Sequence, residues 1–554
     1  MNKKMVFLTL IVLIVLVAST IFATDANIKY GGILNITGNG VDVAASFNPF
    51  LSSADQCVPF VYEPLMYVNS LNGSIIPMLA TAYQWEDNNL KMVVTIRKGV
   101  KWSDGVPFTP EDVVFTFNLL KKYPALDLYG IWSSSSNLQT VESSGDNVVF
   151  EFSKPNVSMY YYILRTYIVP EHIWSKVKDP TTFTNSDNPV GTGPFLRTSY
   201  SVDNDTEYFS KNPNYWWEGR PYIDGVRLIM ASSGQAILSH LFDGTTQQIN
   251  GPFANPYTIW TSKDPENNII FWPPTSENLL CMNDAKFPFN NAIFRKAIDL
   301  AINKKLLEDR AYWGTGGYNI NEAQVPPYQR AEWFDTNLAT ENEYLSSYNP
   351  TEAQKLLESI GYKKNASGAL VGPDGKQLPT FSILAVPGWV DYITMAQTIS
   401  AELKAIGIDT TIVLQAYSTY ASLLMTGDFD MAIIWAPNGP SPFYTYYPEF
   451  YPSFSAPIGQ NAISNYSRYT NPIITKALDD FNSTSDPVVQ KEAMYTIEKI
   501  LIDEVPVVVL TNRTGFDFYS QKTFVGWPTI SNPYCNAWNG IIGPEIAVLN
   551  VHLK

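Results

Sequence analysis

Cysteine and histidine are scarce in this chain of 554 residues, with three of each. The cysteines Cys57, Cys281 and Cys535 stand far apart, and no two histidines have the short spacing of a metal-binding pair. The spacing therefore predicts no zinc cluster and no other metal site. One disulfide plus a free thiol is an open alternative in an oxidising compartment, but we favour three buried thiols.

Familiar catalytic motifs are also missing. The chain has neither a Gly-x-Ser-x-Gly elbow nor a His-Glu-x-x-His helix, and no spaced carboxylate pair stands out. The Gly191-Thr192-Gly193 stretch is not followed by Lys-Ser/Thr, which argues against a phosphate-binding loop. We expect no catalytic residue and no cofactor. A secreted glycoside-active enzyme stays open as an alternative, because a glycosidase needs only two carboxylates.

Positive charge and long apolar runs are limited as well. With 37 Lys and Arg against 52 Asp and Glu, the formal charge is −15, which makes nucleic acid a poor partner. The one long apolar run, residues 5–17, follows Lys3 and Lys4 and precedes small residues. This pattern predicts a signal peptide over residues 1–23, cleaved after Ala23, and hence a periplasmic protein. An uncleaved membrane anchor is the alternative, and without a nearby cysteine we expect no lipoprotein.

Aromatic residues are abundant instead. The chain has 33 Tyr, 29 Phe and 14 Trp, together 14% of residues. Part of this content fills a large core, but the polar tips of buried Tyr and Trp need partners. The excess therefore indicates that many of these side chains lie on a binding surface.

The stretch from residue 85 to residue 120 carries the clearest local signals. Residues 90–97 form a β-branched strand pattern, and a Ser-Asp-Gly turn follows. Thr109 is a suitable N-cap, and Pro110 takes the first helical position. The apolar face of the expected helix is formed by Val113, Phe117 and Leu120. These signals predict a strand, a turn and a capped helix.

This stretch closely resembles the marker segment of the bacterial extracellular solute-binding proteins of family 5, the dipeptide- and oligopeptide-binding group. The Gly-Thr-Gly-Pro-Phe bend at residues 191–195 is a second specific match, and the resemblance covers nearly the whole mature chain. Members of this family capture ligands for ABC importers. The resemblance therefore implies a binding protein with a small-molecule ligand, ABC permease membrane subunits as partners, and a monomeric state.

The fold that the resemblance implies is α/β and type II periplasmic-binding-protein-like. It has two lobes with an extra domain, an interleaved chain, and a hinge between the lobes. Domain I would comprise residues 27–72, 190–280 and 513–554, domain II residues 73–189, and domain III residues 281–512. Within domain III, residues 380–414 have the strand–helix–strand pattern of a parallel βαβ unit, and residues 294–307 have the periodicity of one helix.

The segment after the strand at residues 429–435 bears on the ligand. Peptide-binding relatives carry an Asp there that pairs with the α-ammonium, whereas this chain has Asn438 and no acid between Trp435 and Tyr447. An amide suits hydroxyl groups, and a buried ammonium needs a carboxylate. We therefore favour an oligosaccharide, β-linked gluco- or manno-, over a di- or oligopeptide. In the peptide alternative Asp391 or Glu449 would bind the ammonium, and a nickel or haem carrier is a further alternative.

Candidate ligand-binding residues follow from their loop positions. Taken singly, each Trp or Tyr among them is about as suited to core packing as to ligand contact. The set comprises Gln56, Asn250, Phe253, Trp389, Trp435, Asn438, Tyr444, Trp527 and Trp538.

Overall fold

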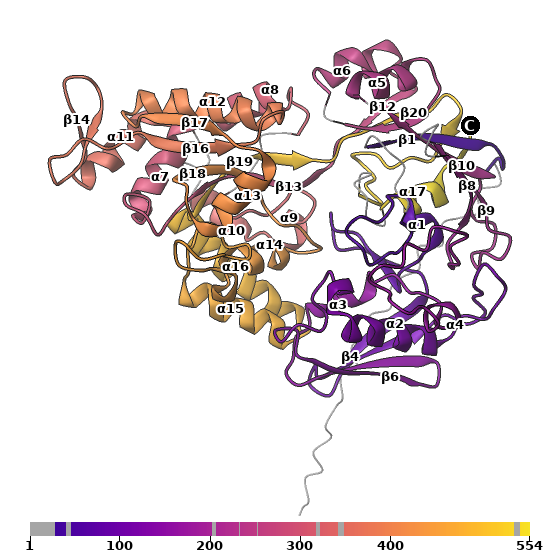
Figure 1. The fold of residues 1–554 in the computed structure, drawn as a ribbon. Coiled ribbons are helices and arrows are strands. Elements are labelled where there is room, and N and C mark those ends of the chain that lie inside the picture. The colour runs from indigo at the N-terminus through magenta and orange to yellow at the C-terminus, as the bar shows by residue number, and fades with distance from the viewer. Residues whose placement is uncertain are drawn as a thin grey trace, which may run out of the picture.

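The structure is a computed structural model that describes residues 28–39, 46–201, 206–231, 233–251, 253–316, 322–341, 348–536 and 543–554. Figure 1 shows three bodies, each built around one of the larger β-sheets, with a left-hand lobe facing two stacked right-hand bodies. Within the described ranges no helix has the length and apolarity needed to cross a membrane. The expected signal peptide lies outside these ranges.

The largest sheet has seven strands, which come from three separated stretches of chain. Its strands in spatial order are β12 (Asn268–Phe271), β20 (Asp517–Ser520), β11 (Gln248–Asn250), β1 (Ile33–Asn39), β10 (Gly225–Ala231), β9 (Thr206–Lys211) and β8 (Phe195–Ser201). Strands β1 and β10 are parallel and pair from Ile33 to Asn39. The accompanying helices are α1 (Val58–Val61), α5 (Gly234–Phe242), α6 (Pro256–Ile259) and α17 (Gly543–Asn550).

The second sheet has four antiparallel strands and contains the marker segment. Its strands are β4 (Ala80–Glu86), β5 (Lys91–Ile96), β7 (Asn147–Phe152) and β6 (Leu138–Ser144), and its helices are α2 (Pro110–Lys122), α3 (Met159–Leu164) and α4 (Glu171–Trp174). The predicted capped helix is confirmed, since the Thr109 backbone N–H donates to Asp112 Oδ2 at 3.0 Å. Its predicted apolar face is buried.

The left-hand lobe holds the third sheet, with five strands. They are β17 (Thr410–Leu414), β16 (Phe381–Ala385), β18 (Met431–Trp435), β13 (Pro274–Met282) and β19 (Val507–Thr514). Its helices are α7 (Ala292–Ala301), α8 (Lys304–Ala311), α9 (Arg330–Trp333), α10 (Thr336–Glu341), α11 (Pro350–Ser359), α12 (Val390–Ala405), α13 (Tyr417–Thr426), α14 (Phe443–Phe450), α15 (Pro472–Ser483) and α16 (Pro487–Glu504). Strands β16 and β17 are parallel and flank α12, which confirms the predicted βαβ unit.

Small elements complete the described chain. They are the strand pairs β2 (Met66–Val68) with β3 (Ile75–Pro77), β14 (Lys363–Lys364) with β15 (Leu370–Val371), and β21 (Phe524–Val525) with β22 (His552–Leu553), and the short 3₁₀ helices η1 (Pro124–Leu126), η2 (Thr261–Lys263) and η4 (Pro452–Phe454).

The prediction of one helix over residues 294–307 is wrong. Helix α7 ends at Ala301, and α8 begins at Lys304. Asn303 separates them, because its side chain accepts a hydrogen bond from the Leu306 backbone N–H at 3.0 Å. An Asn that caps a new helix competes with continuation of the old one, although the apolar periodicity runs through both.

Two chain crossings join the left-hand lobe to the seven-stranded sheet. Residues 272–273 lie between β12 and β13, and residues 515–516 lie between β19 and β20. The crossings are adjacent, since the Gly515 backbone N–H donates to the Pro273 carbonyl at 2.9 Å. The strands on either side are paired within their own sheets, so these short segments are where a bend between the bodies is least costly.

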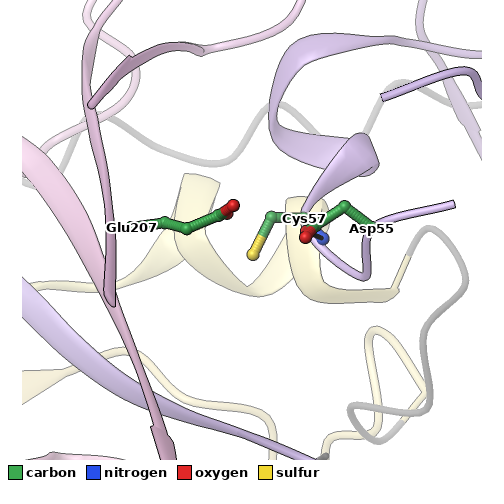
Figure 2. Close-up of side chains that lie close together, drawn as sticks. All are labelled: Asp55, Cys57 and Glu207. Atoms are coloured by element: carbon green, nitrogen blue, oxygen red, sulfur yellow. Dashed lines mark hydrogen bonds between the residues drawn. The ribbon is translucent and has the colours of Figure 1, made fainter. Parts of the chain in front are cut away.

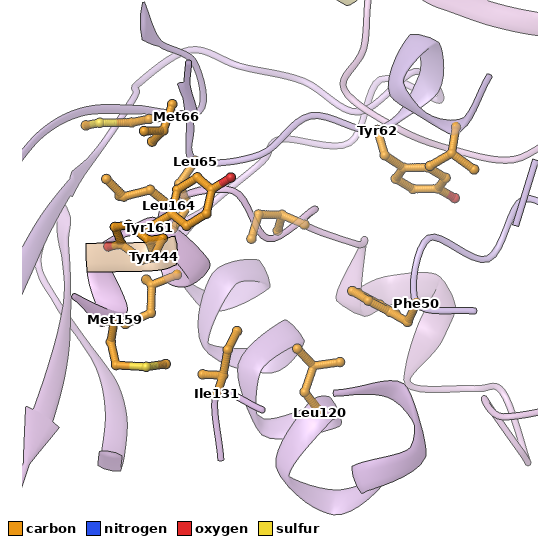
Figure 3. Close-up of a cluster of buried hydrophobic side chains, with 14 of the residues drawn as sticks. Phe50, Tyr62, Leu65, Met66, Leu120, Ile131, Met159, Tyr161, Leu164 and Tyr444 are labelled. Carbon is orange, nitrogen blue, oxygen red and sulfur yellow. The ribbon is translucent and has the colours of Figure 1, made fainter. Parts of the chain in front are cut away.

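A side-chain contact also links the left-hand lobe to the four-stranded body. Tyr444 on α14 is 4% exposed, and its hydroxyl donates to the Ser158 carbonyl at 2.7 Å. Its ring centroid lies 4.9 Å from that of Tyr161, and Figure 3 shows Tyr444 close to Tyr161 and Leu164 of α3. In this conformation Tyr444 therefore fills a core between two bodies.

The Gly-Thr-Gly bend at residues 191–193 is explained by a close backbone approach. A Cβ at Gly191 would lie 1.8 Å from the Val61 carbonyl oxygen, and one at Gly193 would lie 2.5 Å from that of Phe60. The Gly193 backbone N–H donates to the Val61 carbonyl at 2.8 Å. Only glycine allows the chain to lie this close to α1.

Candidate functional site

The left-hand lobe has a pocket of about 430 Å³ near the crossing segments. A volume of this size suits a small-molecule ligand. The lining residues are Ala311, Tyr312, Trp313, Gly388, Trp389, Val390, Asp391, Tyr392, Tyr417, Trp435, Arg513 and Phe516. Two of the predicted residues, Trp389 and Trp435, are therefore in one site.

Sheet topology explains why these two tryptophans meet. Trp435 is the last residue of β18, and Trp389 follows β16 as the N-cap residue of α12. Strands β16 and β18 are parallel, so both rings lie at the carboxyl-end edge of the sheet, where ligands of α/β folds usually bind. Their centroids are 5.8 Å apart with an interplanar angle of 52°. Tyr417 extends this wall, with its ring 5.8 Å from Trp389.

A second aromatic pair connects the pocket to the crossing. Phe516 lies in the segment between β19 and β20, and its ring stacks with that of Tyr312 at 6.5 Å and 6°. Trp272, in the other crossing segment, contacts Phe516 edge to face at 5.1 Å. Movement at the crossing would therefore change the pocket wall directly.

The polar part of the pocket is formed by Asp391 and Arg513. The Tyr312 hydroxyl donates to Asp391 Oδ2 at 3.1 Å, and the Asn278 amide donates to the Tyr312 oxygen at 2.9 Å. The Arg513 guanidinium carbon lies 5.4 Å from the centre of the Trp435 ring. Burial raises the pKa of Asp391 above its usual range, while the Tyr312 hydroxyl and the Arg513 charge act in the opposite direction. The carboxylate thus already has a donor and a nearby cation.

The two acids considered for an ammonium are placed differently. Asp391 lines the pocket, whereas Glu449 on α14 is buried and does not line it. The peptide alternative therefore depends on Asp391.

Three further predicted residues that the structure describes lie outside this pocket. Gln56 is partly buried, with its amide 3.5 Å from Met230 Sδ. Phe253 is partly buried against Phe518 at 5.8 Å, and Asn438 is exposed in the loop after β18. Trp538 lies outside the described residues.

The remaining three predicted residues are buried and have internal partners. Asn250 is 5% exposed, and its amide donates to Asp517 Oδ1 at 2.9 Å. Trp527 is 4% exposed and stacks on Tyr519 at 4.4 Å. Together with Tyr444, described above, these side chains have a packing role in this conformation.

Apart from Asp391 and its neighbours in sequence, six pocket residues are absent from the predicted set: Ala311, Tyr312, Trp313, Tyr417, Arg513 and Phe516. Trp313 has a positive φ of 53°, which is unusual for a bulky residue and is typical of functional sites. Tyr417 starts the helix that follows β17, so its position after a strand was a usable signal. Nothing comparable marks Arg513 or Phe516 in the sequence.

Comparisons with known proteins agree with this architecture. The model of the bacterial extracellular solute-binding proteins, family 5 Middle, matches residues 74–456. The peptide transport periplasmic protein SapA of Salmonella typhimurium is 24% identical over 519 residues, which cover 89% of each chain.

Two crystal structures of one protein give the structural comparison. A periplasmic oligopeptide-binding protein of an oligopeptide ABC transporter from Thermotoga maritima is 27% identical, with a TM-score of 0.84 over 94% of this chain and 99% of that chain. Its mannohexaose-bound structure gives a TM-score of 0.75 over 94% and 98%. The predicted two-lobed, type II periplasmic-binding-protein-like fold is thereby confirmed. Since the family model matches more than half of the sequence, this chain belongs to the bacterial extracellular solute-binding proteins of family 5.

Proposed function

We propose that this chain is the substrate-binding component of an ABC importer and that it captures an oligosaccharide, β-linked gluco- or manno-, for delivery to a membrane permease. The observation that carries this proposal is the wall of Trp389 and Trp435 at the carboxyl-end edge of the parallel strands. Sugar rings present C–H groups on their faces, and partly exposed indole rings offer flat apolar surface to match them.

The polar groups of the pocket support a hydroxyl-bearing ligand. Asp391 accepts a hydrogen bond from the Tyr312 hydroxyl, and the Arg513 charge acts on its carboxylate. Its remaining acceptor capacity suits a sugar hydroxyl, and the guanidinium supplies donors. A sugar would use both groups without bringing an unpaired charge into the pocket.

Closure of the lobes is part of the proposal. The pocket is lined by the left-hand lobe and by a crossing residue, Phe516, so a ligand held there would reach the opposite body only after the lobes approach. The lower TM-score to the mannohexaose-bound structure, 0.75 against 0.84 for the other structure of the same protein, fits a change in lobe arrangement. On closure, Gln56, Phe253 and Asn438 remain candidates for additional ligand contacts.

A peptide is the second candidate ligand, and the presence of Asp391 in the pocket favours it. SapA, whose name states peptide transport, and the Thermotoga protein, whose name states oligopeptide binding, are both similar to this chain. In this alternative the α-ammonium would approach Asp391 and displace the Tyr312 hydroxyl.

The remaining parts of the proposal concern the whole protein. We propose a monomer that is exported by the signal peptide at residues 1–23, works in the periplasm, and has no catalytic activity. Domain I would comprise residues 27–72, 190–280 and 513–554, with domain II at 73–189 and domain III at 281–512. The transport names of the relatives support the absence of catalysis.

The test is a thermal-shift panel of cello-, manno- and xylo-oligosaccharides against di- to pentapeptides, because a ligand that binds the native state raises the melting temperature. We expect a rise with one sugar series and intact sugar afterwards. A rise with peptides alone would contradict the oligosaccharide proposal, and cleaved sugar would contradict the absence of catalysis. No rise with any compound would contradict both ligand candidates.

A further inference from the structure

Two carboxylates and a thiol converge in the interior of the body that holds the seven-stranded sheet. Asp55 and Cys57 lie just before α1, and Glu207 lies on β9. Each offers one potential ligand atom, and these atoms all lie within 4.8 Å of one another. Figure 2 shows the carboxylate of Glu207 directed toward the Cys57 sulfur, with the Asp55 carboxylate on the other side. None of the three lines the ligand pocket.

The cluster is deeply buried. The exposed fractions are 4% for Asp55, 0% for Cys57 and 1% for Glu207. Arg197 contacts Glu207 Oε1 through its Nη2. The other oxygen, Glu207 Oε2, is buried and has no hydrogen-bond partner in the described part of the chain. A buried carboxylate oxygen that has no hydrogen-bond partner costs free energy of folding unless another group or ion binds it.

The net charge of the cluster also favours a bound cation. With both carboxylates and the thiol ionised, the cluster carries three negative charges against the single positive charge of Arg197. A divalent ion would neutralise the remainder, and metal coordination is one of the two ordinary ways to keep buried charges. Asp55 additionally accepts from the Cys57 backbone N–H at 2.7 Å, which fixes the two side chains on the same turn.

We propose that Asp55, Cys57 and Glu207 form a structural binding site for a zinc-like divalent cation, separate from the ligand pocket. A thiolate with carboxylates is a donor set for zinc and its chemical relatives, whereas calcium and magnesium prefer oxygen alone. The ion would tie the segment before α1 to β9, two parts of the chain that are about 150 residues apart. Its role would be to stabilise this body of the protein, independently of ligand chemistry.

The experiment uses the full mature chain without a metal-binding tag, kept reduced, refolded with zinc chloride, and desalted. We expect about one zinc ion per chain by elemental analysis and a higher melting temperature than after refolding with chelator. Cys57→Ala and Glu207→Gln should bind zinc at least roughly tenfold more weakly. Cys281→Ala and Cys535→Ala are matched controls, because both remove a buried free thiol from elsewhere, and they should retain the ion.

Cadmium gives an independent readout, since a cadmium–thiolate bond absorbs in the ultraviolet. The absorption should appear in the wild type and in both control variants and should be absent from Cys57→Ala. Should Cys57→Ala fail to fold, Glu207→Gln carries the test with all three thiols in place. Wild-type protein without retained zinc, or equal zinc in Glu207→Gln and wild type, would overturn the proposal and leave a buried ion-pair cluster.

Discussion

Trp435→Ala removes one face of the aromatic wall and tests the proposed sugar site most directly. The ring is partly exposed in the pocket, and its centroid lies 5.8 Å from that of Trp389. If a sugar ring covers about 60 Å² of the indole, at about 25 cal/mol per Å², the contact contributes about 1.5 kcal/mol. Loss of that contact corresponds to roughly tenfold weaker binding.

The neighbouring ring makes the prediction sharper. Trp389→Ala should weaken binding by a similar factor, because both rings belong to one wall. The double variant should lose less than the product of the two factors, since adjacent contacts that share a ligand are not independent.

The assay is isothermal titration calorimetry with the sugar that gives the largest thermal shift. Tyr257→Ala serves as the control, because Tyr257 is a 51% exposed aromatic residue on α6 that does not line the pocket. Its affinity should equal that of the wild type. Binding within twofold of wild type for both tryptophan variants, with unchanged melting temperatures, would refute the reasoning and place the ligand elsewhere.

Four other outcomes follow. Asp391→Asn should change the affinity for sugar by about 1 kcal/mol or less in titration calorimetry. The same variant should abolish binding of a peptide α-ammonium. A large loss of sugar affinity would count against a role of Asp391 as an acceptor for a sugar hydroxyl. Gly191→Ala should lower the free energy of unfolding in urea by roughly 3 kcal/mol or more, since the new Cβ would lie 1.8 Å from the Val61 carbonyl oxygen. Trp527→Ala should lower it by roughly 3–5 kcal/mol without changing ligand affinity, since this ring is buried and stacked. Burial raises the pKa of Glu277 to about 8, so the folded state keeps a proton that the unfolded state releases above its ordinary pKa. The stability of the folded state should therefore fall as the pH rises toward 8. Glu277→Gln should flatten that fall in profiles of melting temperature against pH.

Local signals predicted the local elements well, and the marker segment shows why. The cap at Thr109, the proline beside it and the apolar face of α2 all act within one stretch of chain. The same approach failed at residues 294–307, where periodicity suggested continuity but α7 ends at Ala301 and Asn303 caps the next helix. The Asn was visible in the sequence, so this error came from giving periodicity more weight than capping.

The candidate site was predictable only in part, for a topological reason. Trp389 follows one of two parallel strands and Trp435 ends the other, and in an α/β sheet such a position directs a residue toward the ligand edge. Arg513 and Phe516 instead lie where β19 leaves the sheet for the other body. Which side chains of such a crossing face the pocket depends on how two bodies meet, and no local pattern carries that information.

The same distinction limits what cysteine spacing excludes. Spacing rules describe sites whose ligands come from one or two short loops, so widely separated cysteines argue only against sites of that kind. Asp55 and Cys57 are close in sequence, but Glu207 joins them only through contact between the α1 region and the β8–β9 strands. No sequence pattern indicates that contact. A buried cluster assembled in this way is visible only after folding, and its unpartnered carboxylate oxygen is the feature that separates a cation site from an ordinary ion pair.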